Sequence, residues 1–337
     1  MDCQNALSIL MRCSAMINNY ASVLADAIQG FILERQALGY TFQKQAASLK
    51  RFDRFCVEIG HDQVCLSKGL AMKWAEKKPW ESDDAQGRRI RLVRMLARYM
   101  IRLGYDAYIY PDHLGVGRSD KYDPYLFTEK EIAEFLNRVG QCSPVKSSPH
   151  RHLVLPLLYR MLYGCGLRVS EALNLTVRDV NMEEGTLTIR NGKFHKDRIV
   201  PMSASLVARC RTYSDAMPPV KHPEQPFFPA AHGGRYSEKR NYDYFRRFIW
   251  EAGISHGGRG KGPRVHDFRH TFAVHCLKRW ARGTVDLTVA LPYLSTYLGH
   301  ESLKGTQRYL RLTAELYPDI VKAMDERFGH VLGGADQ

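Results

Sequence analysis

The sequence predicts a mainly α-helical protein with a small antiparallel β-sheet, divided into an all-helical N-terminal domain and a mixed α+β C-terminal domain. Apolar residues recur at helical spacing over most of the chain, a pattern typical of amphipathic helices. Alternating residues at 186–190, followed by Asn191-Gly192, predict a β-hairpin. The stretch 105–124 is rich in Pro and Gly and lacks periodicity, which indicates a linker.

The length of the chain suits two domains. Its 337 residues can hold two domains of roughly 100–200 residues each, and 45% of them are hydrophobic, so each domain can bury a core. The expected parts are a leader at 1–20, a helical domain at 21–110, a linker at 111–124, a mixed domain at 125–312 and a C-terminal helix or tail at 313–337.

The chain is strongly basic. It carries 49 Lys and Arg against 35 Asp and Glu, which gives a formal net charge of +14. Such an excess favours a polyanionic partner, most simply nucleic acid, with an anionic membrane surface as the weaker candidate. A basic surface that serves only solubility would give the same net charge. The positions of the cations along the chain have to distinguish it from a surface that binds nucleic acid.

Cysteine usage and hydropathy favour a cytoplasmic protein. The eight cysteines are scattered and form no Cys-x-x-Cys pair, which suits reduced thiols better than a disulfide framework. No apolar run is long enough to span a bilayer, and the first twenty residues lack a signal-peptide pattern. We therefore expect no contact with a membrane.

Four helices are expected in the first domain. Apolar spacing predicts helices from Leu24 to Leu38, from Thr41 to Gly60, from Leu66 to Glu76 and from Ala85 to Leu103. Thr41 is expected to cap the second of these, which Gly60 then ends.

The last of these helices carries a row of arginines opposite its apolar stripe. They are Arg88, Arg89, Arg91, Arg94, Arg98 and Arg102. No acidic residue lies between Arg88 and Arg102, so the run contains no i,i+4 ion pair. Arginines without partners suit the phosphate backbone of DNA, although an ordinary solvated face would also explain them.

The mixed domain begins with a clear helix signal. Thr128 and Glu131 form a capping box for a helix that runs through Val139. Further helices are expected at 153–163, at 203–213 and at 237–252, with strands at 186–190 and 197–201. The segment 153–163 is almost wholly apolar and belongs in the core.

Three cations lie close to these elements. Arg168 lies in the turn that follows Gly164 and Gly166 and precedes the next helix. An unpaired charge next to the buried helix 153–163 would be costly. Arg168 either meets an anionic ligand or pairs with Glu171 or Asp179. Lys193 and Lys196 fall on the hairpin loop, where exposed lysines are common and carry no function by themselves.

The stretch Pro263 to Leu310 contains a cluster of residues suited to phosphate chemistry. His266 and Arg269 share one face of a helix, His300 follows a glycine turn, and Tyr309 lies nine positions further on. Tyrosine is a poor nucleophile unless its proton is taken and the developing charge is stabilised. Histidine and arginine supply both when the target is a phosphate, so the stretch predicts phosphoryl transfer.

Several residues in this region have competing explanations. His266 and His270 could bind zinc at their i,i+4 spacing, but no third ligand is near, and His270 is better explained by helix packing or a supporting role. The alternative nucleophiles Tyr293, Tyr297 and Tyr317 lie among apolar residues. Cations expected to contact DNA, with solvated surface as the alternative, are Lys196, Arg259, Lys261 and Arg308.

Five motifs occur in one order along the chain. They are Gly-Leu-Arg-Val-Ser-Glu-Ala-Leu at 166–173, Gly-Lys at 192–193, His-Asp-Phe-Arg-His-Thr-Phe-Ala at 266–273, Leu-Gly-His at 298–300 and Tyr309. Together they resemble the catalytic signature of the tyrosine recombinase (phage integrase) superfamily. The match covers the C-terminal two-thirds of the chain. The N-terminal helices resemble the core-binding domain of that family in kind, though not by motif.

The resemblance implies an active site of Arg168, Lys193, His266, Arg269, His300 and Tyr309. Tyr309 would attack a DNA phosphodiester to form a 3′-phosphotyrosyl bond. The two arginines and His300 would hold the non-bridging oxygens, Lys193 would protonate the leaving 5′-oxygen, and His266 would help to take the Tyr309 proton. Lys196 remains an alternative acid, because Phe194-His195 departs from the family pattern.

The resemblance also implies the partners of the reaction. Double-stranded DNA would be exchanged in a homotetramer, with the C-terminal segment docked on a neighbouring subunit and with no metal, ATP or other cofactor. Integration, excision or transposition of a mobile element is the favoured role. Two alternatives remain open, namely DNA relaxation in the manner of a type IB topoisomerase and a catalytically silent DNA-binding accessory protein.

Overall fold

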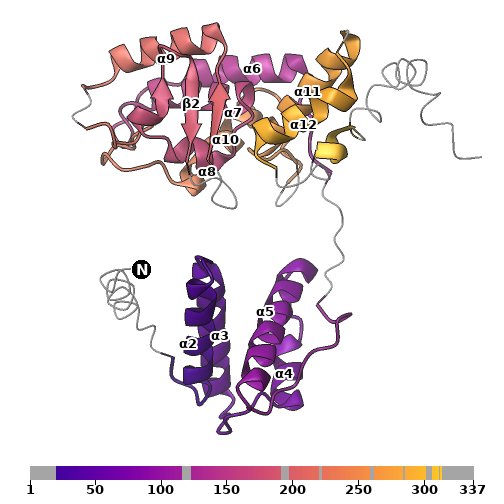
Figure 1. Cartoon of the computed structure of the whole chain (residues 1–337). Helices are drawn as coiled ribbons and strands as arrows, with labels where there is room; N and C mark the ends of the chain where they lie inside the picture. The colour runs from indigo at the N-terminus through magenta and orange to yellow at the C-terminus, as the bar shows by residue number, and fades with distance from the viewer. Residues whose placement is uncertain are drawn as a thin grey trace, which may run out of the picture. The chain divides into compact units, whose positions relative to one another are not determined.

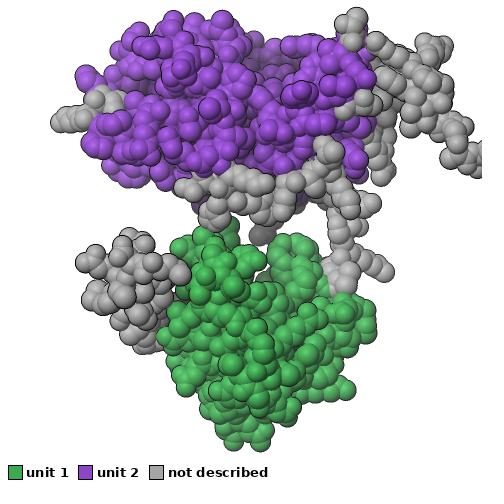
Figure 2. Space-filling model, viewed as in Figure 1, with its two compact units in different colours: residues 1–122 green, residues 123–337 purple. Residues whose placement is uncertain are grey.

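The chain folds into two compact units. The computed structural model describes residues 20–115, 123–190, 197–219, 222–258, 262–283, 285–300, 306–310 and 312. Unit 1 spans residues 1–122 and unit 2 spans residues 123–337 (Figure 2). The division falls within the stretch 111–124. Among the described residues, no helix has the length and apolar character needed to cross a bilayer.

The described part of unit 1 is helical. It consists of α2 (Ala25–Ala37), α3 (Gln43–Glu58), α4 (Lys68–Ala75) and α5 (Asp83–Arg102) (Figure 1). Helix α5 contacts the other three helices. Its buried stripe includes Ile90, Val93, Leu96 and Met100, which join a single hydrophobic core with the other helices. The four helices expected from apolar spacing are confirmed.

One helix start in unit 1 differs from the prediction. The N-cap of α3 is Phe42 rather than Thr41, and it makes no side-chain capping bond. Phe42 has a φ of 46°, and its ring packs edge-on against buried Phe31 with centroids 5.5 Å apart. The prediction of a Thr41 cap was wrong because burial of an aromatic ring, rather than a polar cap, fixes this turn.

Unit 2 combines helices with one small sheet. Its elements are α6 (Glu129–Gly140), α7 (Arg151–Gly164), α8 (Val169–Asn174), η1 (Val177–Asp179), β1 (Val180–Asn181), β2 (Thr186–Ile189), β3 (Arg198–Pro201), α9 (Ala204–Ala216), α10 (Glu238–Glu251), α11 (Asp267–Arg282) and α12 (Leu287–Leu298). The capping box of α6 is present as expected. The strands pair antiparallel in the order β1-β2-β3, with Leu187 opposite Val200. The predicted fold class is confirmed.

Packing fixes helix α11 in the middle of unit 2. Phe268, at its start, packs on Phe127, Phe135 and Phe245 with ring centroids 4.9–5.6 Å apart. Helix α11 also contacts α7 and α12. A buried hydrogen bond joins the backbone N–H of Phe127 to Thr271 Oγ1 at 3.1 Å. Because α11 carries several of the predicted site residues, this packing sets the geometry of the site.

Candidate active site

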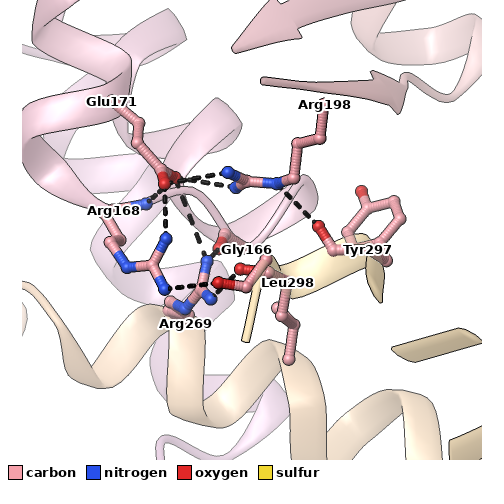
Figure 3. Close-up of polar contacts among 8 residues, drawn as sticks. Gly166, Arg168, Glu171, Arg198, Arg269, Tyr297 and Leu298 are labelled. Carbon is pink, nitrogen blue, oxygen red and sulfur yellow. Dashed lines mark hydrogen bonds and ion pairs between the residues drawn. The ribbon is translucent and has the colours of Figure 1, made fainter. Parts of the chain in front are cut away.

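Residues from separate segments of unit 2 meet around one buried carboxylate. Arg168 precedes α8, Arg198 lies on β3 and Arg269 lies on α11, and all three guanidiniums point toward Glu171 (Figure 3). Glu171 Oε1 accepts from Arg168 Nη1 at 2.6 Å and from Arg198 Nη1 at 2.9 Å. Its Oε2 accepts from Arg198 Nη2 at 2.8 Å and lies 4.0 Å from Arg269 Nη1. The carboxylate thus holds three cations in a fixed arrangement.

The charges at this carboxylate do not cancel. Burial alone would raise the pKa of Glu171, but hydrogen bonds from Arg198 and Arg168 outweigh burial and lower the pKa to about 2. Glu171 is therefore anionic at neutral pH. One negative charge against three guanidiniums leaves a surplus of positive charge, which suits an anionic ligand such as a phosphodiester.

Two glycines supply carbonyl groups that orient the arginines. Gly166 has a φ of +58°, and its carbonyl accepts from Arg269 Nη1 at 2.8 Å. Gly299 has a φ of +64°, and its carbonyl accepts from Arg168 Nη2 at 3.1 Å. A Cβ at residue 166 would lie 2.5 Å from the ring of Phe272. The turns on both sides of the site therefore require glycine for the backbone angle, and at 166 for space as well.

Arg269 is the most enclosed of the three arginines. Its side chain is 1% exposed, and its Nη2 donates to the carbonyl of Leu298 at the end of α12. Burial and the nearby Arg168 lower its pKa to about 10, which leaves it charged at neutral pH. Since removal of a buried charge from its partners is costly, these bonds anchor the start of α11 to the end of α12.

Tyr309 lies beside the arginines with its hydroxyl group inside the protein. The residue is 3% exposed and packs in a hydrophobic cluster with side chains of α11 and α12. Its hydroxyl is 2.9 Å from Nδ1 of His270, and its ring stacks on His300 with centroids 5.9 Å apart. Burial raises the pKa of Tyr309, against the opposing effect of Arg269 and Arg168. The phenol is therefore protonated in the resting protein.

Three histidines in the cluster are neutral at pH 7. Burial, followed by neighbouring cations, lowers the pKa of His266 to about 4, that of His270 to about 3 and that of His300 to about 4. His266 is exposed to solvent, whereas His270 and His300 are partly buried. His300 Nδ1 shares a hydrogen bond of 2.9 Å with Thr306 Oγ1, and His266 meets His270 edge to face at 4.8 Å. Each ring can therefore accept as well as donate a proton.

These shifts predict that the protein loses stability in mild acid. The unfolded chain binds protons on His270 and His300 near pH 6.5, whereas the folded protein does so only near pH 3–4. The free energy of unfolding should therefore fall as the pH drops below about 6.5, with a further loss between about pH 4.5 and pH 2 as Glu171 is protonated.

Denaturant titration of the full chain at several pH values measures this effect. His270→Asn should reduce the slope between pH 6.5 and pH 4 by up to about 1.4 kcal/mol per pH unit, because one proton no longer contributes. A stability that does not change between pH 6.5 and pH 4 would contradict the prediction.

The structure brings together five of the six residues implied by the family resemblance. They are Arg168, His266, Arg269, His300 and Tyr309. The sixth, Lys193, lies outside the described residues, as do Lys196, Arg259 and Lys261. Arg308 is exposed beside Tyr309, 3.9 Å from Asp123.

Sequence reasoning missed Arg198 and undervalued Glu171 and His270. The pairing of Arg168 with Glu171 was weighed only as a structural alternative to a ligand-binding role, and the structure shows that Glu171 also orients other cations. The i,i+3 spacing of Arg168 and Glu171 was the available signal. Arg198 offered none, since it is 27 residues from its partner. His270 was expected to serve helix packing or a supporting role, and the structure places its Nδ1 on the Tyr309 hydroxyl.

The arginines of α5 differ from the expected row without partners. Each guanidinium lies within 4.0 Å of a carboxylate from outside the run 88–102; the pairs are Arg88 and Arg91 with Asp84, Arg89 with Glu81, Arg94 and Arg98 with Asp112, and Arg102 with Glu34. The expectation was wrong because the carboxylates that pair with the run come from outside it, brought close by the fold of unit 1.

Two of these arginines serve the fold of unit 1. Arg89 is 8% exposed and lies over the ring of Trp74, 4.7 Å from its centroid. Arg94 is 9% exposed, and its Nη2 donates to the carbonyl of Pro111 at 2.6 Å. Neither guanidinium is free to neutralise a phosphate. We therefore no longer expect Arg89 and Arg94 to contact DNA. The exposed members, Arg88, Arg91, Arg98 and Arg102, remain predictions.

A basic groove lies on the surface of unit 1 between α3 and α5. It encloses about 960 Å³, and its lining includes Lys44, Arg51, Arg88 and Arg91. Trp80 also lines the groove and is 85% exposed. Lys44 and Arg51 were not identified from the sequence, because they belong to a different helix from the arginine row. Cations on two helices together with an exposed aromatic ring suit a nucleic-acid surface.

Comparison with known proteins agrees with this geometry. Residues 126–315, more than half of the chain, match the model of the phage integrase family. The chain is 31% identical over 314 residues to the integrase/recombinase y4rB of Sinorhizobium fredii, covering 91% of this chain and 98% of that protein. It is also 31% identical over 201 residues to the tyrosine recombinase XerA of Pyrococcus furiosus, covering 59% of this chain and 61% of that protein.

Solved structures share the fold. The XerH site-specific recombinase in its post-cleavage complex has a TM-score of 0.61 at 20% identity, covering 94% of this chain and 88% of that chain. The Tn1549 transposon integrase has a TM-score of 0.58 at 17% identity, covering 84% of this chain and 94% of that chain. With the family model matching over most of unit 2 and a relative matching over nearly the whole chain, the chain belongs to the phage integrase family of tyrosine-type DNA strand-transferases.

Proposed function

We propose that the protein is a site-specific DNA recombinase that cuts and rejoins strands through a 3′-phosphotyrosyl intermediate. The observation that carries this proposal is the position of Tyr309, whose hydroxyl contacts His270 in the same cluster as Arg168 and Arg269. A tyrosine buried beside two guanidiniums, with a proton acceptor on its oxygen, meets the requirements of a nucleophile directed at phosphate. The relatives named recombinase support the same activity.

The proposed chemistry follows from these residues. Tyr309 Oη bonds to phosphorus while the bond from phosphorus to the 5′-oxygen breaks. Arg168 and Arg269 stabilise the charge that develops on the non-bridging oxygens, and His300 adds a hydrogen bond. Lys193 protonates the leaving 5′-oxygen, and His266, the N-cap of α11, helps to take the proton from Tyr309. Religation reverses these steps, so the energy of the phosphodiester is conserved.

The experiment that tests this function is trapping of the covalent adduct. The protein is incubated with a nicked suicide substrate that carries its candidate site, and a protein–DNA adduct stable in SDS is sought. Proteolysis and mass spectrometry should place the DNA on the peptide that contains Tyr309. Absence of an adduct on any DNA from the region around the gene would argue for the silent accessory protein instead.

A role in integration, excision or transposition of a mobile element is the finer part of the proposal. The name of the Sinorhizobium fredii relative, integrase/recombinase, supports it. We further propose that a homotetramer assembles on two DNA sites. Recombined product that requires two sites in the substrate supports this role, whereas relaxation of a supercoiled circle with one site would favour a topoisomerase.

We propose that the basic groove of unit 1 contacts the phosphate backbone. The double variant Arg51→Glu/Arg91→Glu should weaken binding to all DNA sequences. With fewer phosphate contacts, binding releases fewer counterions from the DNA. The slope of log K against log salt should become shallower by about 1 per lost contact. Fluorescence anisotropy across a salt series measures both quantities.

The matched control for the groove is Lys239→Glu. Lys239 lies on α10 in unit 2, and its side chain is 88% exposed. This variant makes the same type of charge change away from the groove and should leave the salt slope nearly unchanged. Equal slopes for the groove variant and wild type would show that the groove is an ordinary solvated surface that does not contact DNA.

A further inference from the structure

The hydrogen bond between Tyr309 and His270 joins a phenol to an imidazole inside the protein. Burial raises the pKa of the Tyr309 phenol and lowers that of the His270 imidazole to about 3, so the phenol is protonated and the imidazole is neutral. In the tautomer with its proton on Nε2, His270 accepts at Nδ1 from Tyr309 Oη across 2.9 Å, and this is the tautomer suited to removing the phenol proton. An acceptor nitrogen is already in place on the atom that must lose a proton.

The neighbouring histidines are engaged differently. His300 stacks on the Tyr309 ring, and its Nδ1 is hydrogen-bonded to Thr306 Oγ1 at 2.9 Å. His266, one helical turn before His270, meets His270 edge to face with ring centroids 4.8 Å apart. Of the three rings, His270 is the one with a ring nitrogen in hydrogen-bond contact with the Tyr309 hydroxyl among the described residues.

We propose that His270 is a catalytic residue that accepts the Tyr309 proton during strand cleavage, a step that rests on the proposed recombinase function. As Tyr309 Oη bonds to phosphorus, its proton passes to His270 Nδ1 and leaves an imidazolium. The bond to the 5′-oxygen breaks, and that oxygen takes its proton from the general acid. In religation His270 returns the proton to Tyr309, so proton and electron counts balance over the cycle.

The surroundings of His270 couple this proton transfer to bound DNA. Burial lowers its pKa first, and His266, Arg308, Arg269 and His300 add to the effect. A phosphodiester bound at the arginines would offset the charges of Arg269 and Arg308 and raise the pKa of His270 toward its ordinary value. The imidazole becomes a competent base only when the substrate is present, so Tyr309 stays neutral in the absence of DNA.

The variants His270→Asn and His270→Ala test this assignment. Asparagine can accept a hydrogen bond close to the position of Nδ1 but cannot take a proton, whereas alanine can do neither. Both variants should form the adduct roughly 10²–10⁴-fold more slowly than wild type, with DNA affinity unchanged. A wild-type rate for His270→Asn would overturn the assignment, because it would show that orientation alone is needed.

A matched control lies on the same helix. His275 Nδ1 also shares a hydrogen bond of 2.9 Å with a tyrosine hydroxyl, that of Tyr163, outside the arginine cluster. His275→Asn should therefore cleave at the wild-type rate, and thermal unfolding of each variant checks that the fold is retained. His266→Asn is compared in the same assay. If it lost more activity than His270→Asn, the base would be His266.

Two chemical substitutions separate the base from the acid. A fluorotyrosine at position 309 has a more acidic phenol and should restore much of the rate in His270→Asn while changing wild type little. A substrate with a bridging 5′-phosphorothiolate, whose leaving group needs no proton, should restore Lys193→Ala but neither His270 variant. No rescue by fluorotyrosine would overturn the base role. Absence of an adduct with wild type would overturn the recombinase function and this assignment together.

Discussion

Replacement of Tyr309 by Phe is expected to abolish the covalent protein–DNA adduct while DNA binding remains nearly intact. The substitution removes one oxygen atom and leaves the ring in its cluster, stacked on His300. The nucleophile is lost, whereas the arginines that attract phosphate are unchanged. The fold should survive, because the main cost is the unpaired His270 Nδ1, worth about 1–3 kcal/mol when such a group is buried.

The measurement uses the suicide substrate and a denaturing gel, with binding followed by anisotropy. Tyr293→Phe is the control, since Tyr293 is 72% exposed and lies outside the cluster. That variant should form the adduct as wild type does. An adduct that persists in Tyr309→Phe would place the nucleophile on another residue and remove the central argument for this site.

Glu171→Ala is expected to destabilise unit 2 and to abolish most of the cleavage activity. The carboxylate is held by Arg168 and Arg198 and lies near Arg269, so its removal leaves buried cations without compensation. Loss of one partner from a buried ion pair costs about 3–5 kcal/mol. Cleavage should slow by about 10²-fold or more, because the arginines no longer hold the geometry of the phosphate site.

Denaturant titration and the rate of adduct formation measure these two effects separately. Asp179→Ala provides the control, since Asp179 is a buried carboxylate paired with Arg190 and hydrogen-bonded to Thr176, away from the cluster. The Asp179→Ala variant should be less stable than wild type. Under conditions where it remains folded, it should cleave DNA at the wild-type rate. If the Glu171→Ala variant cleaved DNA as fast as the Asp179→Ala control, the Glu171 carboxylate would stabilise the fold without contributing to cleavage.

Much of the fold was predictable because its signals are local. The capping box of α6 lies within four residues, and the alternation of β2 and β3 is visible in a short window. The cluster of His266, Arg269, His300 and Tyr309 was also accessible, since one stretch of sequence contains all four residues. Patterns of this kind need no knowledge of distant contacts.

The remaining features depend on contacts between distant segments. Arg198 on β3 meets Glu171 on α8 only in the folded protein, and neither residue type nor spacing predicts the pair. The partners of the α5 arginines come from α2, from the residue before the N-cap of α5, from its first turn and from the segment after it, and the composition of the run could not reveal them. His270 and His266 are equivalent by residue type, and only the direction of the ring toward Tyr309 distinguishes them.

The surplus of guanidinium charge around Glu171 has a consequence for the resting enzyme. Mutual repulsion among Arg168, Arg198 and Arg269 is only partly relieved by one carboxylate, so the empty protein is less stable than its packing alone would allow. Under the proposed function, we expect a bound DNA phosphate to relieve the remainder. The same surplus of positive charge that attracts a DNA phosphate therefore lowers the stability of unit 2 without DNA. Binding of DNA should raise the free energy of unfolding of unit 2.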